Sequence, residues 1–367
     1  MNIAIVASAG GNQRHRLLAV ARELGREHHV TIYSRRDNAE GKPKTRVAPG
    51  VTLEQLEVGP PKDLPADDVL PYLNDLGDSL MRRWSQDRPD VIHAHTWTWG
   101  LAAVAGVKGL SVPVTQTFHT VDELHKDVER ALGRRANAVI AGSGDEESAL
   151  IRLGVPRGNI AIVPYGVDTE RFQRRGPMAT RGSRKRLLHV GPLTPERGAP
   201  TIIRALQGLS DVELVIAGGP EPEDLDDDRD VRRLRSLAEQ LGVDDRVTLL
   251  GQVKRAMVPK LMRSADAVVS VPREAVTGIV ALEAMACGVP VIASAVGAHL
   301  DSVIDGVTGL LVPPDRPART ARLARELLWD PTLRTALGYA GADRARSRYS
   351  WERVSQELVR VYEQACA

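Results

Sequence analysis

The sequence contains little cysteine and almost no net charge. Its 367 residues include two cysteines, Cys287 and Cys366. Two are too few for a disulfide scaffold or a Cys-rich zinc site, and they are typical of a reducing compartment. Lys and Arg total 49 against 47 Asp and Glu, which gives a formal net charge of +2. This balance gives no sign of a nucleic-acid partner, and we expect none.

Long hydrophobic runs are also absent from the sequence. Apolar runs such as residues 279–282 are far shorter than the roughly 20 residues that cross a bilayer. Residues 1–9 are apolar but too short for a secretory signal with its basic flank, and they are better interpreted as a buried strand. We therefore expect a cytoplasmic protein without stable membrane insertion.

Apolar segments of strand length alternate with amphipathic helical segments along the chain. Such alternation predicts parallel strands with crossover helices, hence an α/β doubly wound sheet. In the first half the predicted elements are strands 2–7, 29–33, 51–58, 90–93, 113–118 and 138–141, helices 12–26 and 67–85, and a loop over 36–49.

The alternation pauses over residues 165–184 and then restarts, which indicates a domain boundary. We expect a first domain over residues 1–166, a linker over 167–184, a second domain over 185–349 and a C-terminal helix over 350–367 that packs back on the first domain. In the second half the predicted elements are strands 186–190, 212–217, 247–250, 267–270 and 289–293 and helices 199–206, 230–241 and 278–287.

A glycine-rich turn follows the first predicted strand, where Gly10 and Gly11 precede a predicted helix. Backbone amides in such a turn can approach an anion closely. The dinucleotide fingerprint G-x-G-x-x-G is absent, which disfavours a nicotinamide cofactor. The turn could equally be a tight connection that needs glycine for its backbone angles.

The most informative segment is residues 271–294, VPREAVTGIVALEAMACGVPVIAS. Thr277 could cap a helix that begins at Gly278, and the glycine and proline near the end of the segment would terminate it. The helix start offers free amides at Gly278, Ile279 and Val280 and a partial positive charge, which suit a diphosphate.

Glu283 lies on the same predicted helix, about 7.5 Å along the axis from Gly278. A carboxylate there could accept both hydroxyls of a ribose whose phosphates rest on the helix start. The apolar neighbours of Glu283 indicate a buried face, and a buried acidic side chain needs a partner. The alternative is an ordinary surface glutamate.

Several short motifs, in their order and spacing, resemble retaining glycosyltransferases of family 4, which have the GT-B fold. The motifs are residues 89–95 (PDVIHAH), 116–119 (QTFH), 166–168 (GVD) with Phe172, 241–243 (LGV) with Val247, and 282–292 (LEAMACGVPVI). The resemblance covers nearly the whole chain and implies two Rossmann-like domains that face a central cleft. It also implies metal-independent chemistry with no cofactor, a nucleoside-diphosphate sugar on the C-terminal domain and an acceptor mainly on the N-terminal domain.

The resemblance assigns roles to single residues. Gly10 and Gly11 match the first glycine loop of the family, on the acceptor side. His119 matches the catalytic-site histidine that touches the donor sugar in such enzymes, although it could also be a core histidine at a strand end. Val253 lies in a loop that resembles the one that binds the base through its backbone.

The sequence departs from the family pattern in the donor site. The family usually carries two glutamates with seven residues between them, but Ala275 stands at the first position and Glu274 is one residue early. Pro192, which carries no charge, stands at the position where the family usually has a phosphate-binding arginine. Arg197 replaces the usual lysine and can supply a forked contact to phosphate. One cation of a two-cation clamp is therefore missing.

Four residues at or just after the end of the predicted strand 90–93 do not point to one function. His93 and His95 lie at strand spacing and face the same way, but no third metal ligand is near them in sequence, so we expect a structural role. Trp97 and Trp99 follow, and they could either stack on an acceptor ring or simply pack.

These observations predict a glycosyltransferase that moves a sugar from a nucleoside-diphosphate sugar to a small-molecule acceptor, in natural product biosynthesis. Arg197 and the helix start would stabilise the leaving diphosphate, and His119 with Glu274 would orient the sugar. The resemblance implies retention by front-face attack. Two alternatives stay open: a GT-B nucleotide-sugar epimerase or sugar-1-phosphate enzyme, and a non-catalytic nucleotide-sugar binder.

Overall fold

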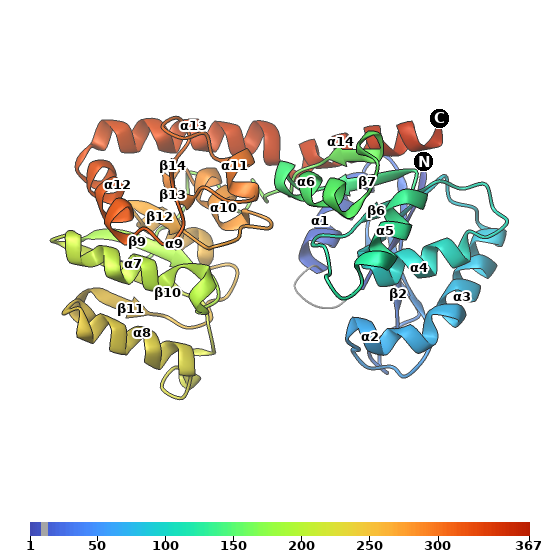
Figure 1. Ribbon diagram of the computed structural model, residues 1–367, viewed down its shortest axis with the longest axis horizontal. Helices are drawn as coiled ribbons and strands as arrows, with labels where there is room; N and C mark the ends of the chain where they lie inside the picture. The colour runs from blue at the N-terminus through green and yellow to red at the C-terminus, as the bar shows by residue number, and fades with distance from the viewer. Residues whose placement is uncertain (9–13) are drawn as a thin grey trace. The chain divides into compact units, whose positions relative to one another are not determined.

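The computed structural model describes residues 1–8 and 14–367. The described chain divides into two compact units (Figure 1). Unit 1 consists of Met1–Pro164 and Trp351–Ala367, and unit 2 of Tyr165–Ser350. The C-terminal helix, drawn in red, therefore belongs with the blue and green elements of the N-terminal half (Figure 1).

In the described part of unit 1, eight strands form one sheet in the order β3-β4-β2-β1-β5-β6-β7-β8. Neighbouring strands of this sheet are parallel except β3 and β4, which are antiparallel. The strands are β1 (Asn2–Val6), β2 (His29–Arg35), β3 (Lys44–Ala48), β4 (Val51–Leu56), β5 (Val91–His95), β6 (Val114–Thr117), β7 (Ala138–Ala141) and β8 (Ile160–Ile162).

The helices of unit 1 follow the strands in the expected alternation. They are α1 (Arg14–Leu24), α2 (Ala66–Val69), α3 (Leu73–Gln86), α4 (Thr96–Gly106), α5 (Lys126–Arg135), α6 (Gly144–Leu153) and α14 (Trp351–Cys366), with short 3₁₀ turns η1 (Leu70–Tyr72) and η2 (Arg157–Asn159).

Two predictions for unit 1 are wrong in detail. The loop predicted over residues 36–49 contains β3, a polar edge strand that pairs with β4 alone and so lacks a hydrophobic signal. The single helix predicted over 67–85 is divided into α2, η1 and α3. Pro71 lies in η1, and a proline has no backbone N–H to continue an α-helical hydrogen-bond ladder.

Helix α14 packs against α1 through its apolar stripe. Val354, Leu358 and Val361 are buried in the same cluster as Leu17 and Ala21. This is the face that the helical periodicity marks as apolar. The packing makes the last residues of the chain part of unit 1.

In unit 2, which is fully described, six strands form one parallel sheet in the order β11-β10-β9-β12-β13-β14. The strands are β9 (Lys185–Val190), β10 (Val212–Ala217), β11 (Val247–Leu249), β12 (Ala267–Ser270), β13 (Val291–Ser294) and β14 (Leu310–Val312). The helices are α7 (Ala199–Ala205), α8 (Arg229–Gln240), α9 (Val258–Ser264), α10 (Ile279–Ala286), α11 (Ala298–Ser302), α12 (Pro317–Trp329) and α13 (Pro331–Tyr349), with 3₁₀ turns η3 (Pro195–Arg197), η4 (Leu206–Gly208), η5 (Pro222–Asp224) and η6 (Asp244–Arg246).

The sheet of unit 2 is buried on both faces. Leu187 and its neighbour Leu188 in β9 are both fully buried but belong to different apolar clusters. One cluster packs on α7, α8 and α12 and the other on α9, α10 and α13. Burial on both faces explains why consecutive residues in the middle of these strands are apolar.

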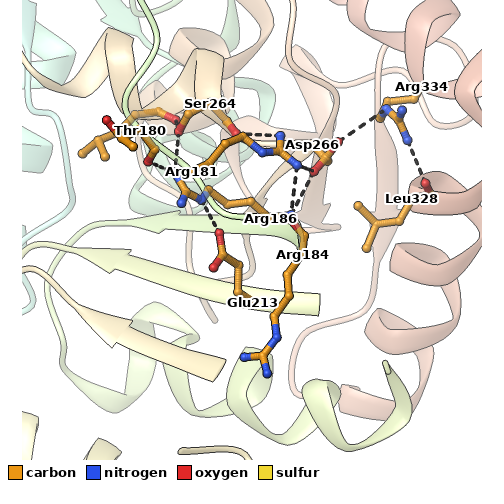
Figure 2. Close-up of polar contacts among 10 residues, drawn as sticks. Thr180, Arg181, Arg184, Arg186, Glu213, Ser264, Asp266, Leu328 and Arg334 are labelled. Atoms are coloured by element: carbon orange, nitrogen blue, oxygen red, sulfur yellow. Dashed lines mark hydrogen bonds and ion pairs between the residues drawn. The ribbon is translucent and has the colours of Figure 1, made fainter. Parts of the chain in front are cut away.

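A polar network ties the segment before β9 to the body of unit 2 (Figure 2). Arg186 is 7% exposed, and its Nε donates to Glu213 Oε1 at 2.6 Å. Its Nη1 donates to the Thr180 carbonyl oxygen and to Ser264 Oγ, both at 3.0 Å. Asp266 Oδ2 accepts from Arg181 at 2.7 Å. These contacts fix the irregular segment against the sheet.

Candidate active site

The loops of unit 2 that contain the predicted donor-binding residues leave one edge of the sheet. All strands of this sheet are parallel, so their carboxyl ends lie at the same edge, which is where α/β sheets bind ligands. Three backbone hydrogen bonds join the loops in pairs. They are Arg273 N to Glu196 O, Ala298 N to Ala275 O, and Gly218 N to Gly251 O, each at 2.8 Å.

Helix α10 starts at this edge with a left-handed glycine. Gly278 has φ +58° and is the N-cap, and the helix begins at Ile279. The prediction that Thr277 caps the helix is wrong, because the cap makes no side-chain hydrogen bond and the glycine turns the backbone instead. A side chain at position 278 would lie 3.3 Å from His299 Cδ2. The first amides, including those of Ile279 and Val280, have no intrahelical acceptor and carry the positive end of the helix dipole.

Glu283 is 1% exposed, so its predicted burial is confirmed. Its partner is Arg255, which the sequence interpretation missed. Arg255 Nη1 donates to Glu283 Oε2 at 3.1 Å, and Nη2 donates to Oε1. The guanidinium carbon also lies 4.7 Å from the centre of the Phe172 ring. The rule that a buried carboxylate needs a cation was available from the sequence, but no local spacing identifies which cation it is.

The remaining donor-side residues lie on loops at the same edge. Val253 is partly buried, two residues before Arg255. Arg197 and Glu274 are exposed and lie on the two loops that the Arg273–Glu196 hydrogen bond joins. Ala275, by contrast, is 6% exposed. The loop therefore turns position 275 inward and position 274 toward solvent.

In unit 1, three histidines lie at the carboxyl ends of two neighbouring strands. The ring centres of His93 and His95 are 4.2 Å apart, so the prediction that they face the same way is confirmed. His93 Nδ1 is 2.7 Å from Tyr362 Oη, and Nε2 is 2.9 Å from Thr117 Oγ1. His95 Nδ1 lies 3.1 Å from His119 Nε2. His93 is thus used structurally, as expected, and His95 supports His119.

The backbone at these strand ends is held in unusual conformations. Thr96 and His119 have φ of +63° and +70°, a region that residues other than glycine seldom adopt. Gln116 Nε2 donates to the Thr96 carbonyl oxygen at 2.9 Å, which fixes the turn after β5. Positive φ at such residues is a strain that surrounding contacts must maintain, and it is concentrated at functional sites.

Burial shifts the pKa values of His119 and of Glu146, which lies nearby in α6. Burial, and to a lesser degree the charge of Arg16, lowers the pKa of His119 to about 4, so its imidazole is neutral at pH 7. Burial raises the pKa of Glu146 in α6 to about 7, while the backbone N–H groups of Gly142 and His119 act in the opposite direction. A neutral imidazole has one donor and one acceptor nitrogen, and Nε2 of His119 is already used in the contact with His95.

Other predicted site residues contribute less. Trp97 and Trp99 are 5% and 7% exposed, which supports packing. The Trp97 ring stacks on His125 with centres 4.1 Å apart. Gly10 and Gly11 lie outside the described residues. Within residues 1–8 and 14–367, no cluster of three His, Cys, Asp or Glu side chains could hold a metal ion, and no helix has the length and apolarity of a membrane span.

Fold and site together define a glycosyltransferase. The family model described as "Glycosyltransferase Family 4" matches residues 10–171, and "Glycosyl transferases group 1" matches residues 171–344. The chain belongs to this family, as the motifs predicted. It is 31% identical over 390 residues to a D-inositol 3-phosphate glycosyltransferase of Xylanimonas cellulosilytica, covering 97% of this chain and 92% of that protein. A protein of the same name from Acidothermus cellulolyticus is also 31% identical, over 95% of this chain and 84% of the relative.

Solved structures confirm the predicted GT-B fold. Sucrose-phosphate synthase from Thermosynechococcus elongatus aligns with a TM-score of 0.84 and 25% identity, over 99% of this chain and 98% of that one. HepE of Anabaena, in complex with UDP and glucose, aligns with a TM-score of 0.76 and 20% identity, over 98% of both chains.

Proposed function

We propose that this glycosyltransferase moves a sugar from a nucleoside-diphosphate sugar to a small-molecule acceptor, with retention of configuration and without metal or a resident cofactor. The observation that carries the proposal is the start of α10, where Gly278 is the N-cap, the first amides have no intrahelical acceptor and Glu283 follows on a buried face. Oriented amides at a helix start suit a diphosphate.

Each residue of the donor site has a role in this proposal. The amides of Gly278, Ile279 and Val280 bind the diphosphate, and Arg197 adds a forked cation to it. Glu283 binds the ribose hydroxyls after its guanidinium partner moves aside. The backbone at Val253 contacts the base, and Thr277 and Glu274 line the route to the sugar.

On the acceptor side, His119 orients the donor sugar as a neutral hydrogen-bonding group. The loop with Gly10 and Gly11 contributes to acceptor binding. In the retaining reaction the bond from the anomeric carbon to the diphosphate oxygen breaks, the bond to the acceptor oxygen forms on the same face, and the diphosphate takes the acceptor proton. Electrostatic stabilisation of the leaving diphosphate is the main contribution of the protein.

Two sources of similarity guide the choice of substrates. The structures of HepE contain UDP and UDP-glucose, so a uridine-based donor is the first to test. The curated relatives are named for D-inositol 3-phosphate, so a phosphorylated polyol is the first acceptor to test. We expect the acceptor to be a small molecule that is an intermediate in natural product biosynthesis.

The test is a thermal-shift screen of UDP, GDP, ADP and TDP and their sugars in the presence of EDTA. A ligand that binds the native state alone raises the melting temperature as its concentration passes Kd. We expect one nucleoside diphosphate to stabilise the protein, and Glu283→Ala to remove that stabilisation. The matched control is Asp343→Ala, which removes an exposed carboxylate of α13. No stabilisation by any of them at millimolar concentration would contradict the proposal.

Activity separates the proposal from a nucleotide-sugar epimerase or a sugar-1-phosphate enzyme. The stabilising donor is incubated with and without inositol 3-phosphate and a panel of small acceptors, and products are identified by mass and by the anomeric coupling constant. We expect an α-linked product from an α-linked donor, formed only with acceptor. A changed sugar nucleotide in the absence of acceptor would favour the epimerase.

A further inference from the structure

His189 in β9 is a buried histidine with one uncommitted ring nitrogen. The side chain is 2% exposed. Its Nδ1 lies 3.0 Å from the Val269 carbonyl oxygen, which can only accept a hydrogen bond, so Nδ1 carries a proton. Its Nε2 is buried and has no hydrogen-bond partner among the residues that the structure describes. Burial lowers the pKa of His189, so without ligand the ring is neutral and Nε2 holds a lone pair.

Nε2 is directed toward the start of the loop over residues 191–198. A Cβ atom placed on Gly191 would lie 3.9 Å from Nε2. His189 is two residues after Leu187 in β9, so both side chains lie on the same face of the sheet. On that face Leu187 shares an apolar cluster with Leu193 and Ala199 at the two ends of the loop. The imidazole therefore lies beneath this loop, at the carboxyl edge of the sheet.

The loop itself offers little to an anion at this point. The Gly191 amide donates to the Ala217 carbonyl oxygen at 3.0 Å. Pro192 has neither an N–H nor a charge. Arg197 is a cation, but it lies at the far end of the loop in η3. A buried polar atom without a partner is rare in native proteins and calls for a physical reason.

We propose that His189 is a phosphate-binding residue of the donor site, whose Nε2 hydrogen-bonds the diphosphate across the gap that Gly191 and Pro192 leave. The inference rests on the proposed function, because it requires a diphosphate at this edge of the sheet. An ionised diphosphate oxygen only accepts hydrogen bonds, so Nε2 takes up a proton from the buffered solvent when the nucleotide binds, and the conjugate base of the buffer remains in solution. The resulting N⁺–H···O⁻ contact is charge-assisted and short.

This arrangement differs physically from an arginine at position 192. A guanidinium is charged with or without ligand, whereas the buried imidazole is neutral until an anion compensates the cost of its desolvation. Glycine at position 191 is necessary here, because a side chain would separate Nε2 from the ligand. The site therefore acquires its second cation only in the complex with a nucleoside diphosphate.

The experiment is isothermal titration of the full chain with UDP, uridine and inorganic diphosphate. Three proteins are compared: the wild type, His189→Phe, which keeps a ring of similar volume, and His189→Gln, whose amide can donate a hydrogen bond. We expect His189→Phe to weaken binding of UDP and inorganic diphosphate about tenfold, equivalent to about 1.4 kcal/mol. Uridine affinity stays unchanged, and His189→Gln recovers part of the loss. Adding Pro192→Arg to His189→Phe also restores UDP affinity.

The outcomes separate this inference from the proposed function. If His189→Phe melts normally and binds UDP as tightly as the wild type, the inference is wrong while the proposed function stands. If His189→Phe weakens the binding of UDP and of uridine equally, His189 is a structural residue and the inference is again wrong. If the wild type binds neither UDP nor inorganic diphosphate, the proposed donor site fails, and the role of His189 fails with it.

Discussion

Arg255 and Glu283 form a forked ion pair in which a half-exposed arginine covers a fully buried carboxylate. The Arg255 side chain is 48% exposed and that of Glu283 is 1% exposed. Both carboxylate oxygens are engaged by the guanidinium, so under the proposed function a ribose at Glu283 competes with Arg255 for their lone pairs. An exposed arginine can move into water at small cost, which makes the pair compatible with ligand binding.

Removing Arg255 leaves a buried carboxylate without its cation. We expect Arg255→Ala to lower the free energy of unfolding by about 1–3 kcal/mol, since a buried polar group then loses its partner. Urea unfolding measures the change. In the double variant Arg255→Ala/Glu283→Gln the neutral amide needs no cation, so most of the loss should disappear. Equal stability of Arg255→Ala and the wild type would show that the pair is not maintained in solution.

The network around Arg186 should be among the most sensitive features of unit 2 (Figure 2). Arg186→Leu leaves Glu213 without its 2.6 Å partner. We expect a loss of about 3–5 kcal/mol, as for other buried pairs broken on one side. Arg184 provides the matched control, because its 2.9 Å pair with Asp245 is exposed on both sides. Arg184→Ala should change stability by less than about 1 kcal/mol. Similar urea midpoints for the two variants would contradict this prediction.

Glu146 makes the stability of unit 1 depend on pH. Its pKa is raised from 4.5 to about 7, so between these values the native state keeps a proton that the unfolded chain has lost. Its contribution to the free energy of unfolding therefore falls as pH rises through this window and stays low above pH 7. Glu146→Gln is neutral throughout, so relative to the wild type it should gain at most about 3 kcal/mol between pH 4.5 and 8.

The comparison of wild type and Glu146→Gln in urea at several pH values isolates this group, because the other titrating residues are common to both proteins. Asp145→Asn serves as the control, because it makes the same carboxylate-to-amide change at an exposed neighbouring position in α6. A difference between wild type and Glu146→Gln that is constant with pH would mean that Glu146 titrates normally.

Gly218 and Gly242 have positive φ for different reasons. A Cβ on Gly218 would lie 2.0 Å from the Gly191 carbonyl oxygen, whereas a Cβ on Gly242 would have nothing within 4 Å. Gly242→Ala should therefore cost about 1–2 kcal/mol, the usual strain of a left-handed residue. Gly218→Ala must in addition displace the loop at Gly191, so we expect a larger loss of stability and weaker UDP binding. Equal melting temperatures for the two variants would disprove this contact.

Most of the fold could be predicted because its signals are local. In unit 2, the predicted bounds of β10 and β12 match the observed ones, since both segments are mainly apolar and each follows an aspartate. Strand β3 could not be predicted, because an edge strand such as Lys44–Ala48 is held by pairing rather than by its own hydrophobicity. The predicted N-cap of α10 is wrong for a related reason. Both Thr277 and Gly278 are residue types that fit a helix start, and only the backbone angle at position 278 decides between them.

The sequence by itself determined the family, the alternation of strands and helices, and the burial of Glu283, because motif order and periodicity are properties of the chain. Only the tertiary structure decided which distant residues contact the residues of those motifs. Arg255 precedes Glu283 by 28 positions, His93 is 269 positions from Tyr362, and His189 is 80 positions from Val269. Hydrogen bonds and ion pairs act over a few ångströms. Parallel strands bring segments that are distant in the sequence to one edge of a sheet. These partners are therefore fixed by the packing of strands and helices, and not by spacing along the sequence.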